Sequence, residues 1–164
     1  MSETQARLDL YTIVSAVSNV GLVYDIQKWS NDWSKFLDHF KTTISGTAQI
    51  RGWCVTGGAP VTDSMEGYAW DIDKDNMVIT RTYNYVIRGV FSLNDASSTE
   101  KTALGISINV MTALNKSATL HNGTRYDQRT PLATLDIFEP RVFGGTLCHY
   151  AEIRQQLIEA VQIA

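Results

Sequence analysis

Cysteine, histidine and long apolar runs are all scarce in this sequence, and each shortage excludes a class of protein. The two cysteines, Cys54 and Cys148, lack CxxC spacing, so we expect two reduced, largely buried thiols and no disulfide framework. No apolar run approaches the roughly 20 residues that cross a bilayer. The first residues lack the basic flank and apolar core of a signal peptide. We therefore expect a soluble, unexported protein without a membrane partner.

Charge of one sign is not concentrated in either half of the chain. The 164 residues carry 14 Lys and Arg against 17 Asp and Glu, a formal net charge of -3. Residues 1–82 hold 7 basic and 10 acidic side chains, and residues 83–164 hold 7 of each. A protein that binds nucleic acid through phosphates gathers Lys and Arg on one face. The charge balance counts against a general nucleic-acid-binding protein and leaves a small local patch open.

Residues able to perform nucleophilic catalysis are few and scattered. His39, His121 and His149 lie far apart in the sequence. Cys148 directly precedes His149, but neighbours on a strand face opposite sides of a sheet and cannot form a catalytic dyad with each other. No histidine spacing typical of a zinc site is present. The sequence therefore predicts no enzyme, and a hydrolase that uses Cys148 or His149 is the remaining enzymatic alternative.

Residues 71–76, DIDKDN, resemble a calcium loop only in part. Asp71, Asp73 and Asp75 stand at the first spacings of such a loop. Asn76 replaces the glycine of its turn, and Thr82 stands where the bidentate Glu should be. The two Gly-Gly pairs of the chain lack the surrounding residues of a phosphate loop. We interpret the acidic stretch as a solvated turn and predict neither a metal nor a cofactor.

The first forty residues predict a helix, a strand and a second helix. Residues 5–18 form a one-sided apolar helix, residues 20–29 change to β-branched and alternating character, and residues 30–40 return to helical spacing. The apolar positions of the first helix are Leu10, Ile13, Val14 and Val17. Those of the second helix are Trp33, Phe36, Leu37 and Phe40. We expect both stripes to pack against a sheet.

The central part of the chain predicts strands around an exposed loop. Residues 48–58 are typical of a short strand stopped by Gly57-Gly58 and followed by a loop of turn-forming residues. Residues 77–93 are long enough for an extended strand, and neither of its sides is cleanly apolar. We expect this strand to be partly covered on both faces or to contain a bulge at Gly89.

A capped helix follows over residues 98–116. Ser97 and Glu100 have the spacing of a capping box. Gly105 inside the helix costs about 1 kcal/mol relative to Ala, which is tolerable if another backbone packs closely there. The broad apolar face of this helix consists of Ala103, Leu104, Ile108, Met111 and Leu114. Residues 115–130 then form a polar connection.

The chain closes with two β-like segments joined at Gly144-Gly145, a pattern typical of a hairpin. The last ten residues fit both a strand and a helix template. Taken together, the elements predict a single α+β domain over residues 1–164. Its sheet should be mixed or mainly antiparallel, with two to three helices packed on it.

Residues 81–95, RTYNYVIRGVFSLND, raise the question of a nucleic-acid-reading surface. The segment RGVF at 88–91 follows the start of the basic-Gly-aromatic signature of RNA-recognition sheets, and Tyr83 and Tyr85 add aromatics that look exposed. The signature is incomplete, since Val90 takes the first aromatic place. The aromatic stripe of the second helix could stack on bases too, but its helical spacing favours the core.

Four stretches, taken in order, carry a family resemblance. They are GLVYDIQKWSNDWSKFLDHF at 21–40, IRGW at 50–53, RTYNYVIRGVFSLND at 81–95 and ATLDIFEPRVFGGTLCHYAEIRQQL at 133–157. These stretches and the order of predicted elements resemble the tail-terminator and tail-completion proteins of long-tailed bacteriophages. The resemblance covers most of the chain and rests on element order and sequence texture.

The resemblance implies a non-enzymatic structural protein of the virion. Copies would form a ring, a hexamer in that family, which caps the tail tube, ends its polymerisation and joins it to the head connector. The implied partners are copies of the chain itself, the tail-tube protein and a head-completion or connector protein. The protein would lie at the head-proximal end of the tail, and in the host cytoplasm during assembly. The alternatives are a head-side connector, a minor tail subunit or a nucleic-acid-binding α+β module.

A ring requires heterologous contacts, in which one surface of a subunit meets a different surface of its neighbour. The two polar loops, residues 57–69 and 117–130, are the expected contact regions. The two arginines of the long strand have opposite parity, so at most one of them serves any single surface. The candidate interface residues are Arg81, Arg88, Arg125 and Arg129.

Overall fold

The computed structural model describes residues 3–28, 30, 32–64, 77–93, 98–116 and 131–163. Within these residues, three helices and six strands form an α+β fold around one open sheet, which confirms the predicted class. The elements in chain order are α1 (Glu3–Ser15), β1 (Leu22–Tyr24), α2 (Trp33–Asp38), β2 (Lys41–Ile44), β3 (Thr47–Ser64), β4 (Met77–Ser92), α3 (Thr99–Lys116), β5 (Thr134–Phe143) and β6 (Thr146–Ile163).

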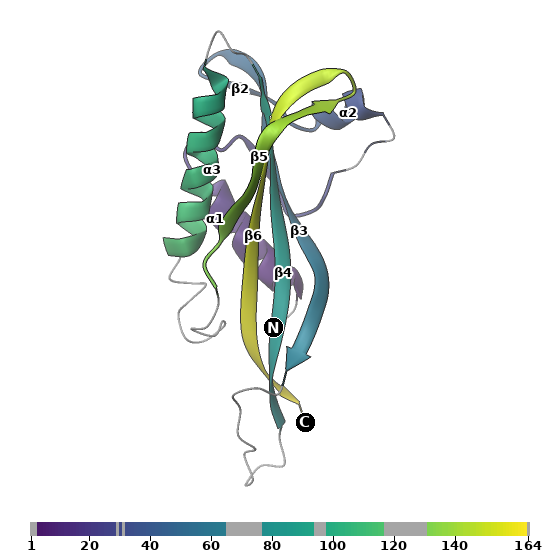
Figure 1. Cartoon of the computed structure of the whole chain (residues 1–164), viewed down its shortest axis with the longest axis vertical. Coiled ribbons are helices and arrows are strands. Elements are labelled where there is room, and N and C mark those ends of the chain that lie inside the picture. Colours follow the sequence, from purple (N-terminus) through teal and green to yellow (C-terminus); the bar gives the residue numbers. More distant parts are fainter. Residues whose placement is uncertain are drawn as a thin grey trace.

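The sheet is mixed and mainly antiparallel, as predicted. Its strand order is β1-β3-β4-β6-β5, and β2 pairs with the first part of β3. Only β1 pairs in parallel, with β3, and the other described pairs are antiparallel. β4 and β6 pair without a break from Met77↔Ile163 to Ser92↔Cys148. β3, β4 and β6 therefore continue past α3 as a narrow extension of the sheet (Figure 1).

One face of the sheet is covered by α1 and α3. Alternate residues of β4, among them Tyr83, Tyr85 and Ile87, are buried against these helices. Leu10 and Val14 of α1 are fully buried in the same cluster, which confirms the predicted stripe of that helix. The burial of Tyr83 and Tyr85 corrects the expectation that they are exposed: a ring enclosed in the core cannot stack on a base.

The buried face of α3 differs from the predicted one. Ile108 is 43% exposed and Leu104 is only partly buried. A polar residue belongs to the buried stripe instead, because the Ser107 hydroxyl donates to the Ala103 carbonyl oxygen at 2.8 Å and is satisfied within the helix. The buried residues of α3 are Ala103, Ile106, Ser107, Val110 and Leu114.

The opposite face of the sheet is covered at one end by α2. Leu37 is buried there in a second cluster with Val90, and Phe36 stacks on Phe143 at 5.5 Å between ring centroids. Phe40 is also buried. These contacts confirm that Phe36, Leu37 and Phe40 of the predicted stripe belong to the core. The side chains of the two tryptophans near this helix lie outside the described residues.

The strand that was expected to stop at Gly57-Gly58 continues to Ser64. Its pairing with β4 shifts register between Gly58 and Thr62 and then resumes. The glycine allows a close approach of α1: a Cβ on Gly57 would lie 2.9 Å from Nη2 of Arg7. Glycine in a strand can mark such an approach and need not end the strand. The first part of the predicted loop 57–69 is therefore strand, and residues 65–69 lie outside the described residues.

Of the two alternatives for the long strand, coverage on both faces is confirmed and the bulge is not, and one other local prediction is wrong. No bulge occurs at Gly89, which pairs in register with Trp53 and Ala151; the glycine makes room for the indole of Trp53. The predicted strand over residues 20–29 shortens to the three residues of β1. The sequence interpretation also missed β2, which forms a hairpin with β3.

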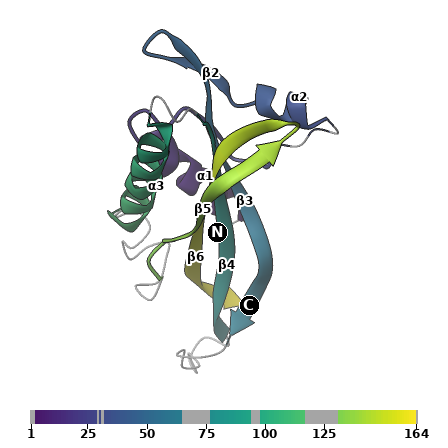
Figure 2. The same ribbon diagram turned by 45° about the horizontal axis from the view of Figure 1, so that its top comes forward.

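The C-terminal hairpin is confirmed. β5 and β6 are joined at Gly144 and Gly145, whose φ values of 57° and 83° favour glycine. The last residues, which fit both templates, form strand to Ile163. Figure 2 shows this hairpin curling over α2, while the β2–β3 hairpin projects on the other side.

The predicted calcium-like turn 71–76 and Ser97 of the capping box lie outside the described residues.

Candidate interaction surfaces

A polar network crosses the sheet on the face opposite α1 and α3. Arg88 Nε donates to Glu152 Oε1 at 3.3 Å, and Arg88 Nη1 donates to Thr56 Oγ1 at 2.9 Å. The Tyr150 hydroxyl donates to the same Glu152 oxygen. The guanidinium of Arg141 lies over the Tyr150 ring, 4.0 Å from its centroid. These five residues, the Arg88 network, connect β3, β4, β6 and β5.

Tyr150 stays a hydrogen-bond donor at neutral pH. Burial of its hydroxyl, followed by the hydrogen bond to Glu152 and the charge of that carboxylate, raises the pKa of Tyr150 to about 12. The Glu152 carboxylate accepts hydrogen bonds from the Tyr150 hydroxyl and from the half-buried guanidinium of Arg88. The negative charge of this largely buried carboxylate is therefore paired. The network can therefore fix the register of the strands.

Arg81 lies on the other face of β4 and forms a bidentate pair with Asp63 of β3. Its Nε and Nη2 donate to the two carboxylate oxygens at 2.7 and 2.8 Å. These hydrogen bonds raise the pKa of Arg81 and lower the pKa of Asp63. Asp63 and Arg81 are direct cross-strand partners, and both side chains are substantially exposed. An exposed pair of this kind contributes little stability.

The structure places two of the four predicted interface arginines. Arg81 and Arg88 lie on opposite faces, as their parity predicted, and each forms an ion pair within the chain. Their contact with another subunit stays a prediction. Arg125 and Arg129, together with the predicted contact loop 117–130, lie outside the described residues.

A groove of about 780 Å³ lies where β5 leaves β6, on the face that carries the Arg88 network. Its apolar lining comes from Pro60 of β3, Val86 of β4, and Pro131 and Leu132 ahead of β5. Leu132 is 65% exposed. The groove can therefore take an apolar side chain from outside the chain.

The polar part of this groove is held by hydrogen bonds across the strands. Asn84 Nδ2 donates to the Pro60 carbonyl oxygen at 2.6 Å, and Gln156 Nε2 donates to Asn84 Oδ1 at 2.9 Å. Arg154 Nε and Asp136 Oδ2 form an ion pair at 2.8 Å. These contacts hold the lining in place and put one charge of each sign on the groove.

Two apolar side chains are exposed at the end of the β5–β6 hairpin. Val142 and Leu147 are direct cross-strand partners, one pair away from the Gly144-Gly145 turn, and are 66% and 45% exposed. Cross-strand partners share a face of the sheet and contact each other. We call this pair the hairpin tip.

A second groove of about 530 Å³ lies between the β2–β3 hairpin and the first turn of α3. Arg51 lines it and donates to the Asn19 carbonyl oxygen at 3.0 Å and to Gln49 Oε1 at 2.8 Å. Burial lowers the pKa of Arg51. The hydrogen bonds of the Arg51 guanidinium thus connect the segment before β1 with the first part of β3.

The two cysteines are buried and free, as expected. Burial raises the pKa of the Cys148 thiol to about 11 and also raises the pKa of Cys54. Cys148 lies in the cluster under α2, whereas His149 lies on the other face, with Nε2 3.1 Å from Thr99 Oγ1. The two neighbours do not meet, as the alternation of a strand predicted. Their surroundings leave little thiolate at neutral pH.

The sequence interpretation missed the groove and the hairpin tip. Val142 and Leu147 flank the predicted Gly-Gly turn symmetrically, and this placement was the available signal for a cross-strand pair. The exposure of these two side chains depends on how the hairpin curls away from the rest of the sheet. The pattern of residues along the sequence does not predict this curvature.

No protein-family model matches this sequence, and no curated protein matches it significantly. No helix among the described residues is long and apolar enough to cross a membrane. Those same parts of the chain contain no group of three His, Cys, Asp or Glu side chains placed to hold a metal ion.

Proposed function

We propose that this chain is a structural subunit of a phage tail-terminator ring, in which several copies cap the tail tube, end its polymerisation and join it to the head connector. The observation that carries the proposal is the hairpin tip, an apolar pair exposed on a curled projection of the sheet. Apolar side chains gathered on a projection are stabilised when another protein surface covers them. The tip therefore favours a role in assembly.

The fold class supports the same role. An α+β chain with an open mixed sheet agrees with the architecture that the family resemblance implies. The Arg88 network joins neighbouring strands by cross-strand contacts. Such contacts favour a rigid subunit that keeps its shape when copies associate.

The proposed role involves no reaction and no cofactor. The high pKa of Cys148 and the separation of its thiol from His149 support a non-enzymatic protein. In this proposal the partners are copies of the chain, the tail-tube protein and a head-completion or connector protein. The site of action is the head-proximal end of the tail, and assembly takes place in the host cytoplasm.

A tube-growth assay tests this function. Purified tail-tube protein is allowed to polymerise with and without this protein, and tube lengths are measured by negative-stain electron microscopy. We expect shorter tubes that carry a ring at one end, and no effect from an unrelated protein at the same concentration. Tubes of unchanged length without terminal rings contradict the proposed function.

A further inference from the structure

The β2–β3 hairpin projects from the end of the sheet (Figure 2), and we call its residues 41–50 the arm. No residue of the arm is buried, whereas Phe40 just before it and Gly52 soon after it are both buried. Burial therefore ends abruptly at the base of the arm. A segment with few buried contacts opens at a lower free energy than the core of the same protein.

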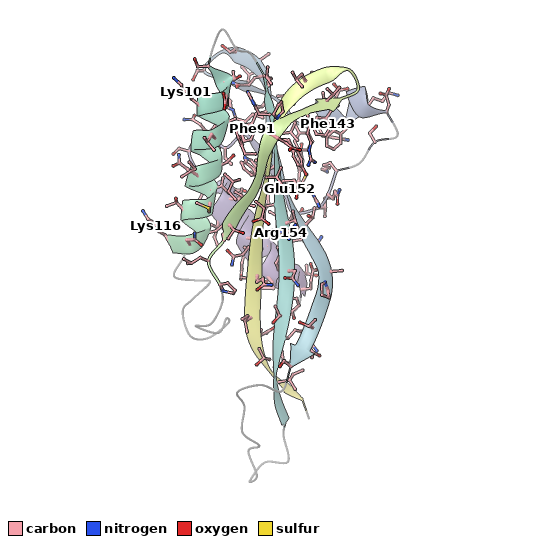
Figure 3. The ribbon with its side chains drawn as sticks, in the orientation of Figure 1. Phe91, Lys101, Lys116, Phe143, Glu152 and Arg154 are labelled. Atoms are coloured by element: carbon pink, nitrogen blue, oxygen red, sulfur yellow. The ribbon has the colours of Figure 1, made fainter. Side chains whose placement is uncertain are left out.

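The arm is a ribbon of two strands. The last pair between β3 and β4 is Arg51↔Phe91, and Figure 3 labels Phe91 at this end of the sheet. Beyond that pair, β3 pairs with β2 alone among the described strands, as far as Ile44↔Thr47. A two-stranded ribbon is marginally stable at best unless a further strand or a helix packs against it.

Two hollows lie between the arm and the rest of the protein. The second groove, of about 530 Å³, is lined by Ile44 and Thr47 of the arm and by Thr102 of α3. Another hollow, of about 400 Å³, is lined by Thr43 of the arm and by Ser92 at the end of β4. The arm is therefore not packed along its length against α3. It can move without disturbing the buried core.

Hydrogen bonds fix the base of the arm. The Arg51 amide donates to the Phe40 carbonyl oxygen at 2.8 Å, and the Arg51 guanidinium donates to the Asn19 carbonyl oxygen at 3.0 Å. The Ile50 amide donates to Ser92 Oγ at 2.6 Å, and the same hydroxyl donates to the Ile50 carbonyl oxygen at 3.3 Å. The Ser92 side chain thus bonds both backbone groups of Ile50 at the point where pairing with β4 has ended.

The turn at the end of the arm holds its two strands together only weakly. Ser45 and Gly46 join the pair Ile44↔Thr47, and their φ values are 52° and 80°. Positive φ at both central residues is typical of a type I′ turn, in which Asn-Gly is strongly preferred. Serine adopts this left-handed conformation less readily than asparagine or glycine. The arm therefore depends mainly on the hydrogen bonds at its base.

We infer that the arm opens and re-forms as a unit while the sheet stays folded, and that the Ser92 hydroxyl controls how often it opens. The inference goes beyond the proposed function and does not depend on it, because every contact that carries it lies within one chain. It makes the arm a part of the molecule that can change shape without loss of the core.

Hydrogen exchange of the full chain, measured by mass spectrometry at single-residue resolution, tests this inference. We expect the hydrogen-bonded amides of residues 42–49 to exchange faster than those of residues 83–89 in β4, and to respond little to low urea. A local opening exposes little surface and has a small urea dependence, whereas exchange through global unfolding has a large one. Measurement at low protein concentration avoids protection by neighbouring copies. Equal protection and equal urea dependence of the two segments would overturn the inference.

Ser92→Ala removes both hydrogen bonds to Ile50. We expect the amides of the arm to exchange about tenfold faster in this variant, and those of residues 83–89 to change much less. Ser107→Ala is the matched control, because the Ser107 hydroxyl bonds within α3 and should not affect the arm. Equal acceleration of both segments by Ser92→Ala would show that the arm opens only together with the sheet, and would overturn the inference.

Ser45→Asn tests the same unit with a variant that should stabilise it. Asparagine suits the first central position of the turn better than serine, so we expect exchange of the arm to slow about threefold. Exchange of residues 83–89 should stay unchanged. Equal slowing of both segments would contradict an arm that opens by itself.

Discussion

Gly89 lies beneath the indole of Trp53, its cross-strand partner on β3. A Cβ added at Gly89 would lie 2.8 Å from two carbon atoms of that ring, and Trp53 is fully buried. We expect Gly89→Ala to lower the free energy of unfolding by about 1–3 kcal/mol, because the ring cannot move away without disturbing the core. Urea denaturation measures the change.

Gly105 in α3 provides the matched control for this substitution. No described atom lies within 4 Å of a Cβ at that position, so the close backbone contact that would account for this glycine is not found among the described residues. Gly105→Ala should raise the free energy of unfolding by about 0.5–1 kcal/mol, because alanine loses less conformational freedom in a helix. Equal effects of the two substitutions would contradict the packing described for Gly89.

Ionisation of Tyr150 lowers the stability of the protein at alkaline pH. Its pKa is about 12 in the folded chain against an ordinary value of 10.0, so the folded state holds the phenolic proton more tightly than the unfolded state. This contribution is complete below pH 10 and is lost as the pH rises from 10 through 12. We expect Tyr150→Phe to show a shallower loss of stability in that window when urea midpoints are compared. Parallel pH profiles of the two proteins would contradict a raised pKa of Tyr150 in the folded chain.

Parity along β4 predicted the opposite faces of Arg81 and Arg88, because side chains alternate along any strand. Their partners, Asp63 and Glu152, could not be predicted, since each lies on a different strand and the pairing depends on the register. For the same reason the exposure of Tyr83 and Tyr85 was misjudged. A strand sequence does not show which of its faces the helices cover.

β6 gives a direct test at the scale of the element. Leu157 is fully buried and its neighbour Ile158 is only partly buried, as expected for adjacent residues of a strand. Leu157→Ala should lower the free energy of unfolding by about 2–5 kcal/mol through loss of apolar contact and cavity formation. Ile158→Ala should cost clearly less, and chemical denaturation compares the two. Equal losses would contradict the one-sided burial of this end of β6.

The elements most fully predicted were those with a strong period and clear end signals: α1, the long strand β4 and the hairpin at Gly144-Gly145. Glycine was the main source of error. Gly57 was taken as a strand end, but it allows Glu3 and Arg7 of α1 to approach β3. Such an approach is a tertiary contact, and local sequence cannot distinguish it from a turn. The face of α3 was misplaced for a related reason, since Ser107 satisfies its hydroxyl inside the helix and can be buried.

At the scale of the whole molecule, helices lie on both faces of the sheet, while β3, β4 and β6 extend beyond α3 (Figure 1). The class of fold followed from the order of elements. The groove did not, because it forms only where β5 parts from β6 and where β3 shifts register against β4. The groove therefore arises from departures from regular pairing, which a binary pattern of apolar and polar residues encodes weakly, whereas the hairpin tip lies in regular pairing.

A chain that associates with itself into a closed ring has a molar mass in solution several times that of the single chain. Size-exclusion chromatography with light scattering should be run on the full chain, alone and with tail-tube protein. We predict one species whose mass is a fixed multiple, larger than two, of the 18.3 kDa single chain, in at least one of the two conditions. A mass of one chain in both conditions would contradict self-association into a ring.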